Sequence, residues 1–173
     1  MNKHSNTLDK IILLTRPQLL QLAPADLLER PGPEKWSKQE ILGHLIDSAY
    51  NNHQRFLRAT EKEDLIFQGY DQVNWVKRNN YQKREPTELV HSWATVNFHL
   101  ARLIAGLPES LLLRPTNAHN FHAICMNRLP GEASTTLDYL IWDYIFHLEH
   151  HLIQLLPHYT RNYLSYSAPN GNL

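Results

Sequence analysis

Apolar side chains recur at helical spacing in four separate segments of the chain, and no segment alternates strongly enough to predict a sheet. The segments span about residues 7–22, 38–60, 86–106 and 135–156. An amphipathic helix must bury its apolar face, and without a sheet only other helices can cover it. We therefore predict an all-α protein, an up-and-down four-helix bundle that forms a single domain over residues 1–173.

Local signals mark the ends of these helices. Ser37, followed by Glu40 three residues later, has the spacing of a capping box and predicts a helix that begins at residue 38. Pro86 suits the first turn of the third helix, and Gly106 is expected to end it. Pro17 lies inside the first segment and is expected to kink or restart that helix.

Two connections are long for a helical bundle. The one before Pro86 is rich in aromatic and basic residues, and it is expected to form a short helix over about residues 71–78 and to line a pocket. The connection between the third and fourth helices is irregular. Leu111–Leu113 and Ala123–Met126 are candidates for short extended pieces within it.

Charge and cysteine content exclude several classes of function. The 17 basic side chains balance the 17 acidic ones, so we expect no nucleic-acid partner, no membrane partner and a small neutral ligand. Cys125 is the one cysteine, which excludes an intrachain disulfide and a multi-thiolate metal site, and it is interpreted as an apolar filler. No apolar run reaches membrane-spanning length, and a soluble cytoplasmic protein is predicted.

The chain has 11 histidines, and three of them fall within the segment FHLEHHLIQL at residues 146–155. A helical residue advances by about 100°, so His147 and His151 share a face, whereas Glu149 points about 200° away from His147. The order of residues excludes the HEXXH motif of zinc proteases. Two imidazoles hold a divalent ion only weakly, and His44, which lies among apolar residues of the second helix, is the candidate for a third ligand.

Two motifs resemble those of the DinB-like (YfiT-like) four-helix bundle family. Lys35–Ser48 reads KWSKQEILGHLIDS, and His147–His151 reads HLEHH. The resemblance covers most of the chain in the order and spacing of its helices. It implies a divalent ion held between the second and fourth helices by His44, His147 and His151.

The chain departs from the family pattern beside the first histidine of the fourth helix. The family often has glycine before this histidine and glutamate after it, where this chain has Phe146 and Leu148. Asp143, one turn earlier, is our candidate for a catalytic residue, as a general base or as an acceptor for a ligand histidine, with a plain surface charge as the alternative. The remaining helical histidines are interpreted as surface or rim residues: His53, His91, His99 and His150.

Three histidine ligands leave coordination positions open, as in catalytic rather than structural metal sites. The resemblance implies transferases that use a low-molecular-weight thiol, such as bacillithiol or mycothiol, with the metal stabilising the thiolate. A thiol S-transferase is therefore the first expectation, a metal-dependent hydrolase the second, and a non-catalytic bundle that binds metal or a partner the third. Zinc or nickel is the expected ion, the substrate is a small molecule, and a homodimer is left open.

Overall fold

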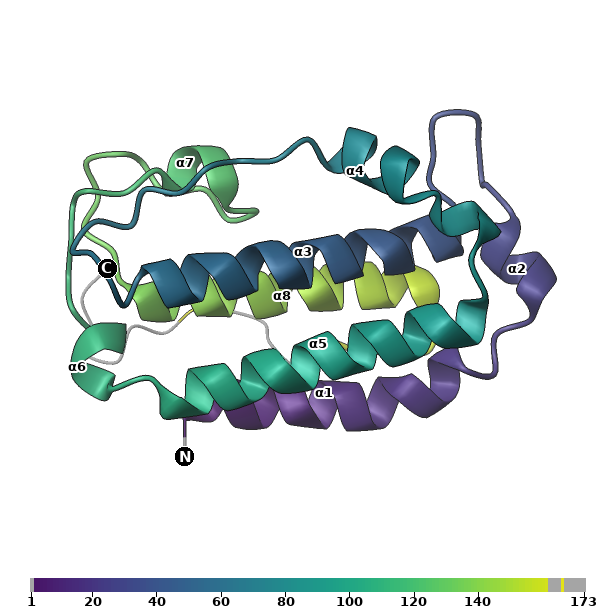
Figure 1. Cartoon of the computed structure of the whole chain (residues 1–173), viewed down its shortest axis with the longest axis horizontal. Coiled ribbons are helices and arrows are strands. Elements are labelled where there is room, and N and C mark those ends of the chain that lie inside the picture. Colours follow the sequence, from purple (N-terminus) through teal and green to yellow (C-terminus); the bar gives the residue numbers. More distant parts are fainter. Residues whose placement is uncertain (1, 162–165, 167–173) are drawn as a thin grey trace.

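The computed structural model describes residues 2–161 and residue 166. Its elements are α1 (Lys3–Leu19), α2 (Pro24–Leu28), α3 (Lys38–Arg58), α4 (Gln72–Asn79), the 3-10 turn η1 (Tyr81–Lys83), α5 (Pro86–Gly106), α6 (Glu109–Leu112), α7 (Phe121–Ile124) and α8 (Leu137–Leu155). The long helices α1, α3, α5 and α8 lie side by side (Figure 1). No strand forms within the described residues beyond two isolated bridges. The predicted all-α four-helix bundle is confirmed.

The long helices surround the core in the order α1, α5, α3, α8, since α5 packs on α1 and α3, and α8 packs on α3 and α1. At the start of α3, Gln39 donates a hydrogen bond to the carbonyl oxygen of Arg84, just before α5 begins. Consequently α3 and α5 run in the same direction. The predicted up-and-down arrangement, in which consecutive long helices alternate in direction, is therefore wrong for this pair, because the connection between α3 and α5 crosses back along the bundle before α5 starts (Figure 1).

The first turn of α3 is held by its cap and by the segment before α5. The Ser37 hydroxyl accepts from the Glu40 amide at 3.2 Å, and the Glu40 carboxylate accepts from the Ser37 amide at 2.9 Å. The predicted capping box is thus confirmed. The Gln39 side chain also donates to the carbonyl oxygen of Tyr81 at 2.6 Å. These contacts fix the helix that carries His44.

Gly43 leaves room for the ring of Tyr81, because a Cβ atom at this position would stand 2.1 Å from Tyr81 Cδ2. We expect Gly43→Ala to lower the free energy of unfolding by about 1–3 kcal/mol through overpacking. The matched control is Gly106→Ala, where a Cβ would meet no atom within 4 Å. Thermal unfolding followed by circular dichroism should show a lower midpoint for Gly43→Ala only. Equal midpoints for the two variants would contradict the close approach.

Two predictions about local structure are wrong. Of the two outcomes predicted for Pro17, a kink or a restart of the first helix, the restart is wrong, because α1 runs without interruption to Leu19 and Pro17 lies in its last turn. The only hydrogen bond that this proline removes would involve Leu13, whose side chain is on the exposed face of the helix. The two segments predicted as extended, Leu111–Leu113 and Ala123–Met126, lie mostly in α6 and α7. Cys125, which follows α7, has an extended backbone.

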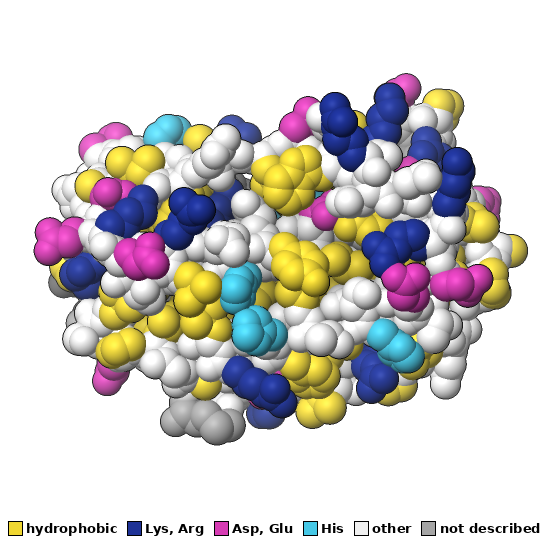
Figure 2. All heavy atoms as spheres, in the orientation of Figure 1, with side chains coloured by type: hydrophobic (Ala, Val, Ile, Leu, Met, Phe, Trp, Pro, Cys, Tyr) yellow, Lys and Arg dark blue, Asp and Glu magenta, His cyan; other side chains and the backbone are white. Residues whose placement is uncertain are grey.

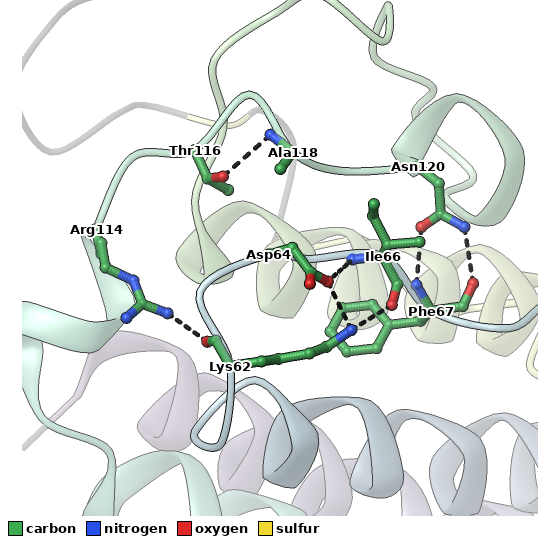
Figure 3. Close-up of polar contacts among 8 residues, drawn as sticks. All are labelled: Lys62, Asp64, Ile66, Phe67, Arg114, Thr116, Ala118 and Asn120. Carbon is green, nitrogen blue, oxygen red and sulfur yellow. Dashed lines mark hydrogen bonds and ion pairs between the residues drawn. The ribbon is translucent and has the colours of Figure 1, made fainter.

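The two long connections are joined to each other (Figure 3). The Asn120 side chain donates to the carbonyl oxygen of Phe67 at 2.7 Å and accepts from its amide at 3.1 Å. Arg114 donates to the carbonyl oxygen of Lys62 at 2.7 Å. Both connections contribute residues to a cavity over α3 and α8. They therefore form its outer wall, and the predicted short helix within the first connection is present as α4.

Basic and acidic side chains are interspersed over the face shown in Figure 2, and no field of one sign dominates this face. Among the described residues, no helix is both long enough and apolar enough to cross a membrane.

Candidate metal centre

Three histidines converge between α3 and α8. His44 Nε2 lies 3.1 Å from His147 Nε2, and the ring of His151 is centred 5.0 Å from that of His44 and 4.7 Å from that of His147. One ring nitrogen from each residue falls within 4.8 Å of the others. His44 is only 1% exposed, and the two histidines of α8 are half-buried. The structure therefore brings together the three residues that the sequence selected.

The donor set of the three histidines fits a divalent ion. Imidazole nitrogens that bind a tetrahedral ion at about 2.0–2.1 Å lie about 3.3 Å apart, close to the separation of His44 and His147. The other separations are no greater than 4.8 Å. Within the described residues, the buried Nδ1 atoms of His44 and His151 have no hydrogen-bond partner. Buried polar atoms are normally paired, but the polar contact of His44 Nε2 is with His147 Nε2, inside the cluster. The observation that fits an ion is therefore the convergence of the ring nitrogens.

Burial keeps the cluster neutral at physiological pH. It lowers the pKa of His44 to about 4. Burial, with smaller contributions from His44 and His150, lowers the pKa of His151 to about 3. Burial also holds the pKa of His147 well below its ordinary value. Neutral imidazoles have a free lone pair, which is the form that binds metal.

These lowered pKa values predict that the metal-free protein loses stability in mild acid. The unfolded chain binds protons at His44 below about pH 6.5, whereas the folded chain does so only near pH 4. The free energy of unfolding therefore does not depend on His44 titration above about pH 6.5, and it decreases as the pH falls from 6.5 toward 4. We expect thermal midpoints measured with a chelator to decrease over this interval. The midpoint of His44→Gln should decrease less steeply with falling pH. If the midpoints of this variant and the wild type decrease in parallel, His44 is not a source of the pH dependence.

The three histidines line a cavity of about 350 Å³. Its walls come from α3, from α8 and from the two long connections. The lining residues are His44, Ser48, Asn52, Arg55, Tyr70, Gln72, Ala123, Ile124, Cys125, Met126, Arg128, Leu140, Asp143, Tyr144, His147, His150 and His151. A larger groove of about 690 Å³ beside Trp36 contains none of the three histidines. The smaller cavity is therefore the candidate substrate site.

Asp143 lies in this cavity, but its hydrogen bonds are with the second long connection. Its carboxylate accepts from the amides of Met126 and Asn127, at 3.0 and 2.7 Å, and from the Asn127 side chain at 2.9 Å. Burial raises the pKa of Asp143, and these hydrogen bonds oppose the shift. No hydrogen bond joins Asp143 to a histidine in the part of the chain that the structure describes. Its catalytic role stays a prediction.

Sequence reasoning missed several residues of the cavity. Ser48, Asn52 and Arg55 follow His44 at intervals of four, four and three residues, which places them on the same face of α3. That spacing could have revealed them. Tyr70 and Arg128 come from the connections, where no periodicity indicates which side chains point inward.

Glu149, predicted to point away from the cluster, is buried and accepts a hydrogen bond from the Tyr159 hydroxyl at 2.6 Å, outside the cavity.

The other histidines of the long helices are not among the three that converge. His53 and His99 pair with each other through nitrogens 3.1 Å apart, a contact between α3 and α5 that the sequence did not predict. His150 is half-buried at the cavity wall.

A four-helix bundle in which two helices bring three histidines to a cavity defines a class of candidate metal-site proteins. The chain belongs to the DinB superfamily, whose sequence model matches residues 13–155. The predicted family is thus confirmed.

A solved structure from Bacillus subtilis, YfiT, is similar to this chain. The match has a TM-score of 0.68 and 16% sequence identity, and it covers 91% of this chain and 87% of that chain. At this identity the likeness shows the fold. YfiT is described as a probable metal-dependent hydrolase with an unusual four-helix bundle topology. No curated protein sequence matches the chain.

Proposed function

We propose that this protein is a metal-dependent enzyme that holds a divalent ion through His44, His147 and His151. The observation that carries the proposal is the convergence of three neutral imidazoles, with one nitrogen of each within 4.8 Å of the others, at the wall of a cavity. Three protein ligands leave a coordination position open, as in catalytic sites. When bound, the ion would supply Lewis acidity for polarising a carbonyl group or activating a water or thiol. Zinc and nickel both suit three imidazole ligands.

Hydrolysis of a small-molecule substrate is the reaction to test first. The similarity to YfiT, with its description as a probable metal-dependent hydrolase, supports this choice. Asp143 is the one acidic residue among the described residues of the cavity, which makes it the candidate general base, and burial raises its pKa. It would accept the proton that the attacking water loses.

Transfer to a low-molecular-weight thiol is the second candidate, and the contacts of Asp143 favour it. Three N–H donors occupy this carboxylate, which weakens it as a base. A thiol would need no such base, because a divalent ion held by the three histidines would lower the pKa of a bound thiol. The protein's own Cys125 is unsuited to this role, since burial and Asp143 raise the pKa of its thiol. The nucleophile would therefore come from solution.

The test compares two panels of substrates with protein purified without a nickel column. One panel contains activated esters and amides, and the other contains small thiols combined with a haloarene or an epoxide. We expect one panel to show a rate that a chelator abolishes and that added zinc or nickel restores. His147→Ala should lack this rate, whereas His91→Ala, which changes an exposed histidine, should retain it. No metal-dependent rate in either panel would favour a non-catalytic bundle that binds metal or a partner.

A further inference from the structure

Arg55 is a buried cation in the wall of the candidate substrate site. It is 7% exposed, and it lies on the same face of α3 as His44. It donates to the carbonyl oxygen of Gln68 at 3.3 Å, and the Asn51 side-chain oxygen, in the orientation that satisfies both groups, accepts from it at 3.2 Å. Ion pairs in the described chain involve other residues, so no carboxylate neutralises Arg55 at contact distance. A buried guanidinium group normally has such a partner.

The charged groups of the cavity leave it electropositive. The buried Arg55 and the exposed Arg128 contribute two positive charges, and Asp143, the one acidic residue among the described lining residues, contributes one negative charge that also acts on Arg55. The Asp143 carboxylate is already occupied by the three donors from Met126 and Asn127. A divalent ion at the histidines would add further positive charge. The local charge therefore differs from the neutral total of the chain, which had suggested an uncharged ligand.

Polar groups of neutral residues line the space between Arg55 and the histidines. Burial raises the pKa of Tyr70 to about 12, so its hydroxyl stays protonated and can donate a hydrogen bond. The Asn52 side chain donates to the carbonyl oxygen of Ser48 at 2.9 Å. Tyr70 and Ser48 both face the cavity. Their hydroxyl groups can donate hydrogen bonds to a charged group that binds to Arg55.

The distance between Arg55, at one end of the cavity, and the three histidines, at the other, suits a small elongated molecule. The Arg55 guanidinium is held by Asn51 and Gln68, which line a neighbouring groove, so it lies at the level of Asn51 where the cavity meets that groove. With a rise of 1.5 Å per residue, the positions of His44 and Asn51 are about 10 Å apart along the helix axis. The cavity volume of about 350 Å³ is at the lower end of the range for ligand pockets. A ligand of a few carbon atoms could reach from one end to the other.

We propose that this cavity binds a small substrate through an oxyanion at one end, a carboxylate or a phosphate monoester, which Arg55 holds with help from Tyr70. The opposite end of the substrate then faces His44, His147 and His151. Guanidinium groups bind both kinds of oxyanion through paired N–H donors. The inference rests on the proposed function for the reaction at the histidines, but the binding step requires no metal.

The test is isothermal titration calorimetry with metal-free protein at fixed ionic strength. The probes are hexanoate, hexyl phosphate and the neutral hexanamide, so that the first two distinguish the kinds of oxyanion. We expect at least one anion to bind about tenfold or more tightly than hexanamide, and Arg55→Gln to remove this advantage by about the same factor. Arg102→Gln makes the same change of charge at an exposed position outside the cavity and should leave binding unchanged.

Three results would overturn the proposal: equal binding of hexanamide and both anions, failure of both anions to bind, or equal effects of Arg55→Gln and Arg102→Gln. Circular dichroism establishes whether Arg55→Gln folds. If it does not, Tyr70→Phe decides, because it keeps the ring and removes only the hydroxyl: a loss of about threefold or more supports the subsite, and no loss overturns it. Since the protein is metal-free throughout, failure of the catalytic assays leaves this result intact, and failure here leaves the metal centre intact.

Discussion

His44→Ala, His147→Ala and His151→Ala are each expected to lose stoichiometric binding of zinc or nickel. Removing one ligand leaves two imidazoles, which hold a divalent ion weakly. The loss of affinity should exceed the roughly 10–100-fold that follows removal of an outer-shell partner of a metal ligand. Elemental analysis after gel filtration, together with competition against a chromophoric chelator, measures the occupancy and the affinity.

His150→Ala is the matched control for this series. His150 lies on the same helix, between His147 and His151 in sequence, but it is not among the three histidines whose nitrogens converge. Its direction around the helix differs from that of His147 by about 60°. We expect the metal content of His150→Ala to equal that of the wild type. Equal losses in all four variants would show that the angular argument selected the wrong ligands.

A divalent ion is also expected to raise the thermal stability of the protein strongly. An ion that binds only the folded chain, at about 1,000 times its dissociation constant, adds about 4 kcal/mol to the free energy of unfolding. For a chain of this length, this corresponds to a rise in the unfolding midpoint of about 8–16 °C. Differential scanning calorimetry of chelated and zinc-loaded protein measures the shift.

Two comparisons show whether the stabilisation comes from the three histidines. Magnesium prefers oxygen ligands and should produce no comparable shift. His147→Ala should respond to zinc much less than the wild type does. An equal response of this variant to zinc would mean that the ion stabilises the fold from another place, and the proposed centre would then be wrong.

Helical periodicity and local boundary signals were sufficient to predict most of the fold. The capping box at Ser37 and Glu40 placed the start of α3, and Pro86 and Gly106 placed both ends of α5. These signals act within one or two turns, so the sequence shows them directly. The direction of α5 relative to α3 was not accessible in this way, because it depends on the path of the connection between them.

For the candidate site, the sequence by itself determined which histidines share a face, and the family motifs singled out His44 as their partner. That information is angular and local, since His147 and His151 are one turn apart on one helix. Only the tertiary structure decided that His44 lies 3.1 Å from His147 and that Asp143 is held by the second connection. It also decided that Arg55 faces the same cavity with no carboxylate partner among residues 2–161 and 166. These features depend on how α3, α8 and two irregular connections pack together. Such packing sums many contacts between residues distant in sequence, and no local pattern records it.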